Sequence, residues 1–253
     1  MTLLGLCAGL TSVRFAIEGR FGAAAGAIVV AALIDGVDGR LARLLKATSR
    51  FGAEFDSLAD FMGFGVAPAF VLYLWSLQQG GGLGFAPCLI FAVCMALRLA
   101  RFNAAIDQDV RGGYAYNFFT GVPAPAGAGL ALFPLFLGLE AQEQGWFWVG
   151  RFAHHPLFAG VVLVGTAALL VSTLPVWSFK NFKVPRDYAL PLLLGVSVFV
   201  AFLVADPWAA LAAAGLVYAA MLPFSRRSYR RLRAEAEQGR ASASSDQTGS
   251  PIG

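Results

Sequence analysis

The sequence predicts an all-α membrane protein, a polytopic bundle of about eight transmembrane helices. Apolar residues make up 58% of its 253 positions and charged residues only 13%, and the mean hydropathy is +0.66. A soluble domain carries about 25% charged residues, so this deficit indicates that a lipid bilayer is the solvent. The apolar residues also form continuous runs and do not alternate with polar ones, which favours helices over membrane-spanning strands.

Eight apolar runs approach or reach the length that crosses the hydrocarbon core, which takes about 20 residues of helix. They cover residues 2–17, 21–44, 53–77, 83–103, 121–140, 156–174, 188–205 and 207–224. The first run has no basic region before it and no small-residue cleavage site behind it, so we expect a retained helix and not a signal peptide. Residues 1–224 are thus predicted to form one transmembrane domain, with a core at about 1–174.

The remaining residues, 225–253, are rich in Ala, Ser, Gly and charged side chains. Such a segment cannot bury an apolar core, so a largely disordered tail is expected. The Lys and Arg residues predict its side, because basic residues gather on the cytoplasmic side of a membrane. With eight spans, all of the 19 basic residues except Arg14, Arg20 and Arg151 fall on the side of the two termini. Both termini are therefore expected in the cytoplasm.

Four aspartates lie at the ends of the second and third apolar runs. Asp35 and Asp38 are three residues apart, and Asp56 and Asp60 are four apart. Residues at these spacings share one face of a helix. The connection between the two runs is short, which makes the two helices antiparallel neighbours. The sequence therefore predicts that the two carboxylate pairs face each other near the cytoplasmic surface.

Carboxylates gathered in this way require a positive partner. An ionised side chain inside the membrane costs at least about 2.5–3.5 kcal/mol. Oxygen ligands select hard cations such as Mg²⁺, Mn²⁺ or Ca²⁺, and two such ions about 3.5–4 Å apart can clamp a diphosphate. Helix capping, or pairing with Arg40, Arg43 and Arg50, accounts for one or two of the aspartates but not for four. The pattern predicts a site for divalent metal ions.

The same stretch reads D-x-x-D-G-x-x-A-R, then eight residues, then G-x-x-x-D-x-x-x-D. It resembles the signature of the CDP-alcohol phosphatidyltransferases, with every motif position filled. The motif positions are Asp35, Asp38, Gly39, Ala42, Arg43, Gly52, Asp56 and Asp60. Members of that family usually carry a short amphipathic segment before the first span, whereas this chain begins with MTLLGLCAGL.

The resemblance implies a role for each of these residues. The four aspartates would bind two divalent ions, Mg²⁺ or Mn²⁺, which grip the diphosphate of a CDP-lipid. Asp60 would also act as the general base on the hydroxyl group of the acceptor alcohol, because a carboxylate within reach can take the proton of a weak nucleophile. The CDP-lipid pocket would be lined by Gly39, Ala42, Arg43, Ser49 and Gly52.

Three stretches resemble the serine-using bacterial and archaeal members of the family. They are FGAEFDSLADFMGFGVAPAF, RLARFN and NFFTGVPAPAGA. The resemblance implies transfer of a phosphatidyl group from CDP-diacylglycerol to L-serine, giving phosphatidylserine and CMP. The candidates for binding the acceptor are Arg98, Arg101, Asn103, Asn117 and Thr120.

Two alternatives stay open at this point. The acceptor can be another alcohol, such as glycerol 3-phosphate, inositol phosphate or ethanolamine, because Arg98, Arg101 and Lys180 could bind a phosphate. A divalent-metal transporter also needs intramembrane carboxylates, but its acidic groups would be spread through the bilayer depth. The expected partners are the two substrates and the lipid bilayer, with no nucleic acid. The small residues of GAAAGA at 22–27 permit close helix packing, and the family resemblance implies a homodimer.

Overall fold

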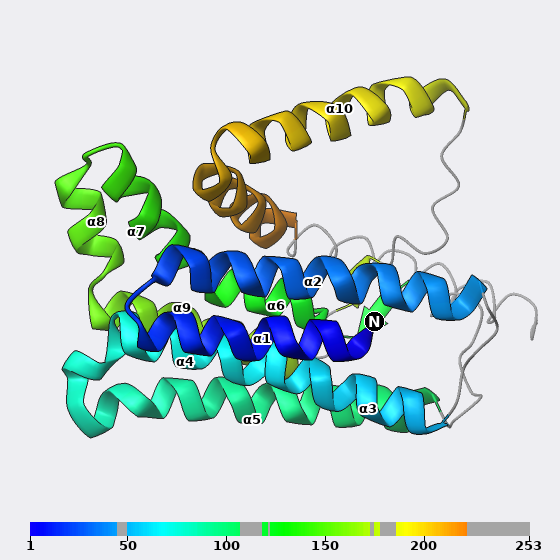
Figure 1. Cartoon of the computed structure of the whole chain (residues 1–253), viewed down its shortest axis with the longest axis horizontal. Coiled ribbons are helices and arrows are strands. Elements are labelled where there is room, and N and C mark those ends of the chain that lie inside the picture. Colours follow the sequence, from blue (N-terminus) through cyan, green and yellow to red (C-terminus); the bar gives the residue numbers. More distant parts are fainter. Residues whose placement is uncertain (45–49, 107–117, 121, 173–174, 178–185, 222–253) are drawn as a thin grey trace, which may run out of the picture.

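The structure is a computed structural model that describes residues 1–44, 50–106, 118–120, 122–172, 175–177 and 186–221. Almost all of this part of the chain is helical, as the sequence predicts (Figure 1). The predicted tail at 225–253 lies outside the described residues.

The N-terminal half is a set of long helices packed side by side (Figure 1). Helices α1 (Thr2–Ile17) and α2 (Phe21–Leu44) pack against each other along their length. The turn between them contains Gly19, whose φ of 74° lies in the left-handed region that favours glycine. Arg14, in the last turn of α1, forms an ion pair with Glu18 at 2.9 Å, and this hydrogen bond lowers the pKa of the Glu18 carboxyl below its ordinary value.

The next elements follow one another as a continuous rod. Helix α3 (Arg50–Asp60) passes into a π-helical segment, η1 (Phe61–Val66), and then into α4 (Ala67–Trp75). A short 3₁₀ turn, η2 (Leu77–Gly80), leads into α5 (Gly81–Ile106), which packs back against α4 and η1. A π-helical turn inside an α-helix is rare and is frequent at functional sites.

The C-terminal half consists of shorter pieces. Helices α6 (Ala124–Ala131) and α7 (Phe133–Glu143) meet at an angle of 47°, and α8 (Phe147–Ala153) and α9 (Pro156–Val171) meet at 54°. After α10 (Arg186–Ala205), the described chain ends with a helix at Pro207–Met221. A small antiparallel ribbon joins β1 (Phe118–Thr120) to β2 (Pro175–Trp177). This ribbon adds to the helical fold that the sequence predicts.

All eight predicted apolar runs coincide largely with helical segments, but length and composition alone do not establish eight spans. Three described helical stretches are long and apolar enough to cross a membrane, at Phe21–Gly39, Phe51–Trp75 and Leu77–Ala104. Each of the two bent pairs can add one span. The segments Thr2–Ile17, Leu190–Ala205 and Pro207–Met221 are apolar but shorter. The fold is thus an integral membrane bundle, and the count of eight stays a prediction.

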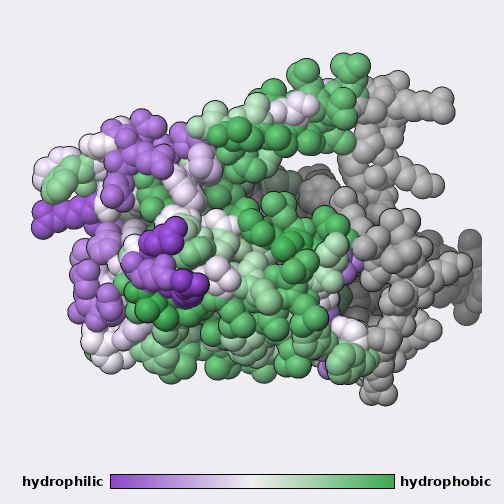
Figure 2. Space-filling model, in the orientation of Figure 1, coloured by the Kyte–Doolittle hydropathy of each residue, from purple (hydrophilic) through white to green (hydrophobic). Residues whose placement is uncertain are grey.

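The surface of the molecule fits a bilayer. Figure 2 shows apolar residues along the sides of the bundle and hydrophilic residues gathered at the end where α7, α8 and the α1–α2 turn lie. Large apolar side chains such as Leu83, Leu193 and Val204 are fully or mostly exposed. Lipid contact explains such exposure, which a soluble domain of this size would not tolerate over so much of its surface.

Candidate active site

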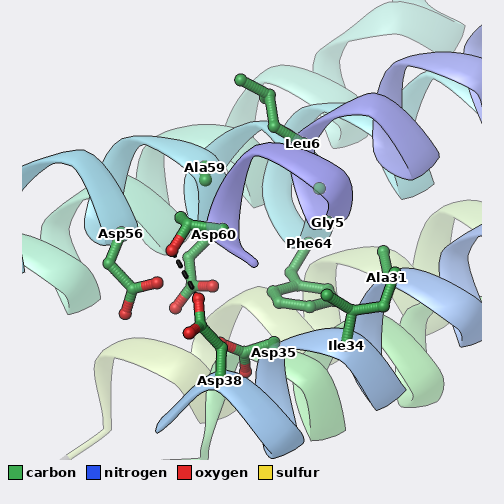
Figure 3. A pocket seen from close by; sticks show the side chains of 12 residues that line it. Gly5, Leu6, Ala31, Ile34, Asp35, Asp38, Asp56, Ala59, Asp60 and Phe64 are labelled. Carbon is green, nitrogen blue, oxygen red and sulfur yellow. Dashed lines mark hydrogen bonds between the residues drawn. The ribbon is translucent and has the colours of Figure 1, made fainter. Parts of the chain in front are cut away.

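The structure brings the four aspartates of the motif together. Asp35 and Asp38 project from α2 and Asp56 and Asp60 from α3, toward a common centre (Figure 3). Carboxylate oxygens of Asp35, Asp56 and Asp60 lie within 4.8 Å of one another. Asp38 borders the same pocket and accepts a hydrogen bond of 2.5 Å from the hydroxyl group of Thr2. All four aspartates are half-buried.

Local helix geometry produces this arrangement. The spacing of three residues on α2 and of four on α3 puts each pair on one helix face, and both helices reach the same end of the bundle (Figure 1). Helix α1 supplies a third wall. Its residues Thr2, Gly5 and Leu6 line the pocket. A Cβ added to Gly9 of α1 would lie 2.9 Å from the Cα of Gly63, so only glycine lets α1 approach the π-helical segment this closely.

The carboxylate cluster fits a hard divalent cation. Two oxygens bound to one ion lie at most twice the metal–oxygen distance apart, roughly 4 Å for Mg²⁺ and 5 Å for Ca²⁺. The oxygens of the three carboxylates lie within 4.8 Å of one another, which is inside the limit for Ca²⁺. Among described side chains, the salt bridges are those of Glu18 with Arg14 and Arg20, so no described side chain forms a salt bridge with the cluster. These acidic groups could therefore hold a metal ion.

Two of the other motif residues, Gly39 and Gly52, are exposed on the helices that carry the aspartates. Gly39 follows Asp38 on α2 and is exposed, and a Cβ added there would meet no atom within 4 Å. Gly52 is exposed in the first turn of α3. Ala42 and Arg43 belong to the last turns of α2, although their side chains are outside the described part. Ser49 lies outside the described residues altogether.

Of the five acceptor-binding candidates, the structure describes three side chains. Arg98 is half-buried on α5, donates a hydrogen bond of 2.5 Å to the carbonyl group of Val122, and is near enough to Asp60 for their charges to interact. Asn103 exchanges hydrogen bonds of 2.9 and 3.1 Å with Ser57, the residue after Asp56.

The other three candidates do not contact the aspartates in the described part of the chain. Arg101 is exposed and donates to the carbonyl group of Val171 at 2.8 Å. Thr120 belongs to β1, opposite Pro175, and its side chain is not described. Asn117 lies outside the described residues. The structure thus brings Arg98 and Asn103 toward the aspartates and engages Arg101 with the end of α9.

Sequence reasoning missed Thr2 and the part that α1 plays. Thr2 precedes Asp38 by 36 residues, and no local motif links the two positions. An apolar cavity next to the site was missed as well. It measures about 360 Å³, lies among α2, α6, α7 and the helix Pro207–Met221, and shares Phe64 with the aspartate pocket. The residues that line this cavity come from four separate segments of the chain, so no single stretch of sequence predicts it.

Fold and site together define a helical integral membrane protein with a carboxylate cluster that could hold a metal ion at the ends of two membrane helices. The chain belongs to the CDP-alcohol phosphatidyltransferase family. The family model of that description matches residues 1–171, and a second model, CDP-alcohol phosphatidyltransferase 2, matches residues 187–223. The family predicted from the aspartate motif is thereby confirmed, and with it an enzyme of the phosphatidyl-transferring class. Family membership favours this enzyme over the divalent-metal transporter.

Similar curated proteins carry one name, CDP-diacylglycerol–serine O-phosphatidyltransferase. The protein of this name from Mycobacterium tuberculosis is 42% identical over 230 residues, which cover 91% of this chain and 78% of the relative. The one from Helicobacter pylori is 36% identical over 204 residues, covering 80% and 79%. The one from Methanocaldococcus jannaschii is 42% identical over 101 residues, covering 40% and 44%.

Proposed function

We propose that this protein is a phosphatidylserine synthase, which transfers the phosphatidyl group of CDP-diacylglycerol to the hydroxyl group of L-serine and releases CMP. The observation that carries the proposal is the carboxylate cluster of Asp35, Asp56 and Asp60, within 4.8 Å at the ends of two membrane helices, with Asp38 beside it. The names of the relatives support serine as the acceptor. Glycerol 3-phosphate, inositol phosphate and ethanolamine are the competing acceptors.

The proposed reaction is a substitution at phosphorus. The serine oxygen forms a bond to the phosphorus that bears the diacylglycerol, and the bond from this phosphorus to the CMP oxygen breaks, with its electron pair leaving on CMP. Asp60 takes the proton of the serine hydroxyl as the new bond forms. Two divalent ions, Mg²⁺ or Mn²⁺, held by the four aspartates would neutralise the diphosphate and the charge that develops on CMP. Arg43 would stabilise the same charge from the end of α2.

The surroundings of the cluster suit a nucleotide on one side and a lipid on the other. Gly39 and Gly52 leave exposed backbone beside the aspartates, where a ligand can approach closely. We assign the CDP pocket to these glycines with Ala42, Arg43 and Ser49. The 360 Å³ apolar cavity lies within the roughly 300–1,000 Å³ of small-molecule sites. Since it shares Phe64 with the aspartate pocket, we assign it to an acyl chain of the lipid substrate.

Acceptor recognition is assigned to residues around α5. An arginine has five N–H donors, and the hydrogen bonds of Arg98 and Arg101 to backbone carbonyls each engage one of them. Donors are therefore left for a serine carboxylate, and the charge of Arg98 already reaches Asp60. Asn103, Asn117 and Thr120 complete the proposed set.

Three further features belong to the proposal. Both termini and the active site would be cytoplasmic, supported by the distribution of basic residues along the sequence. The transmembrane domain would cover residues 1–224, followed by a tail at 225–253. A homodimer is supported by the small-residue face at 22–27.

The test is release of CMP by purified protein in detergent. CDP-diacylglycerol and Mn²⁺ or Mg²⁺ are supplied, and serine, glycerol 3-phosphate, inositol phosphate and ethanolamine are added singly. We expect CMP release with serine alone, and EDTA should abolish it. Release with another alcohol instead would keep the reaction class and reject serine as the acceptor. No release with any of the four, from protein that melts cooperatively, would reject the proposal.

A further inference from the structure

A second acidic cluster lies at the opposite end of the bundle from the aspartate site. It consists of Glu140 and Glu143 on α7 and of Asp206, which follows α10 (Figure 1). Carboxylate oxygens of these three residues lie within 4.8 Å of one another, as do those of Asp35, Asp56 and Asp60. The family motif covers none of them, and the proposed reaction uses none of them.

Glu140 supplies an independent sign that a ligand belongs here. The residue is only 6% exposed, and its Oε2 atom is buried without a hydrogen-bond partner among the described residues. A buried carboxylate oxygen without a partner is costly, and native structures rarely leave one. Because the carboxylate of Glu140 lies against those of Glu143 and Asp206, the unpartnered group is directed into the cluster.

The other two carboxylates are already held in place. The indole nitrogen of Trp208 donates to Oε1 of Glu143 at 2.9 Å, and the backbone nitrogen of Ala209 donates to Oδ1 of Asp206 at 3.2 Å. Each of these bonds engages one oxygen of a two-oxygen group. No salt bridge reaches the three acids from the side chains that the structure describes. The geometry is thus a preformed group of oxygen ligands with an excess of negative charge.

We propose that Glu140, Glu143 and Asp206 bind one hard divalent cation, Ca²⁺ or Mg²⁺. Ligands that are all oxygen select this class of ion, and water would complete the coordination shell. The competing explanation is a proton shared by Glu140 and Asp206. A shared proton neutralises one of the three charges, whereas a divalent cation neutralises two and also gives the orphaned oxygen of Glu140 a partner.

The cation would connect two parts of the fold that also border the apolar cavity. Glu140 and Glu143 belong to α7, and Asp206 caps the helix Pro207–Met221. That helix contributes Leu211, Ala214, Gly215 and Tyr218 to the cavity wall. A cation between α7 and Asp206 therefore fixes the start of the helix that closes the cavity. The role is structural and separate from the ions at the aspartate site.

Trp208 gives this site a spectroscopic signature. Tb³⁺ occupies oxygen sites for Ca²⁺ and emits light when a tryptophan close to it is excited. Trp208 hydrogen-bonds one proposed ligand directly, whereas the lining of the aspartate pocket contains no tryptophan among the described residues. We expect purified, EDTA-treated protein to show Tb³⁺ emission on tryptophan excitation, and added Ca²⁺ to compete it away. Glu140→Gln and Trp208→Phe should each abolish the emission, while Asp56→Asn should keep it.

Thermal unfolding gives the second measurement. Ca²⁺ or Mg²⁺ alone should raise the melting temperature of Asp56→Asn protein, because a ligand that binds only the folded state stabilises it. The rise should be lost when Glu140→Gln is added to Asp56→Asn. If the protein with the buried Glu140→Gln change does not fold, Glu143→Gln, at an exposed position, is added to Asp56→Asn in its place. Emission and metal-dependent melting that survive both glutamate changes would overturn the proposal. A melting temperature that responds to pH but not to the cations would also overturn it, in favour of the shared proton.

Discussion

The hydrogen bond from Thr2 to Asp38 gives the sharpest test of how the structure builds the active site. Replacing Thr2 by valine keeps the shape of the side chain and removes the hydroxyl group that donates to Oδ2 of Asp38 at 2.5 Å. A hydrogen bond to a charged group contributes about 1.5–3 kcal/mol. This bond is partly exposed, so the lower value, about 1.5 kcal/mol, is the better guide. If the whole free energy of this hydrogen bond serves to orient Asp38, its loss should lower kcat/KM about tenfold.

The assay is CMP release from CDP-diacylglycerol and serine, measured over a range of Mn²⁺ concentrations. Thr2→Val should raise the metal concentration needed for half-maximal rate, because Asp38 would no longer be held in place. Thr11→Val is the matched control. Thr11 lies on the same helix, and its hydroxyl donates at 2.7 Å to the carbonyl group of Cys7 and not to an aspartate. Thr2→Ser should restore most of the activity. Equal kinetics for Thr2→Val and Thr11→Val would refute the positioning role of Thr2.

Three further changes test other parts of the site. Asp60→Asn should abolish CMP release while CDP-diacylglycerol still binds in a filtration assay, and near-normal turnover would remove Asp60 as the base. Gly9→Ala should lower stability by about 1–3 kcal/mol, seen as a lower melting temperature, because its Cβ would lie 2.9 Å from Gly63, whereas Gly165→Ala on α9, with nothing within 4 Å, should not. Arg101→Ala should raise KM for serine more than KM for CDP-diacylglycerol, and the reverse would place Arg101 at the diphosphate.

The sequence was sufficient for the aspartate cluster because the cluster follows from local geometry. Spacings of three and four residues define a helix face, and a short connection leaves two neighbouring helices little choice but to run antiparallel. Length and hydropathy similarly located the helical segments. No such rule predicts the contact of Thr2 with Asp38, because this contact depends on how α1 packs against α2.

The breaks in the helices were harder to predict for a physical reason. The sequence suggested one span over 121–140, whereas the structure has α6 and α7 with a bend of 47° at Leu132. Pro134 stands in the first turn of α7, where its missing N–H group costs nothing. The residues that flank this bend are apolar on both sides, so hydropathy cannot locate it. The ribbon of β1 and β2 joins segments more than 50 residues apart, and each strand has three residues, too few for a periodic pattern.

The π-helical segment links the chemistry of the site to the packing of the bundle. It begins at Phe61, directly after Asp60. A π turn holds more residues than an α turn, so it rotates the helix that follows relative to the helix before it. Asp56 and Asp60 can then face α2, while Val71 and Leu72 of α4 are fully buried in the core. In a regular α-helix, the direction in which the aspartates of α3 point would fix the direction in which the core residues of α4 point. The π-helical turn after Asp60 makes the two orientations independent. Gly9 of α1, where a Cβ would lie 2.9 Å from the Cα of Gly63, lets α1 pack closely against this turn, and Thr2 at the start of the same helix reaches Asp38.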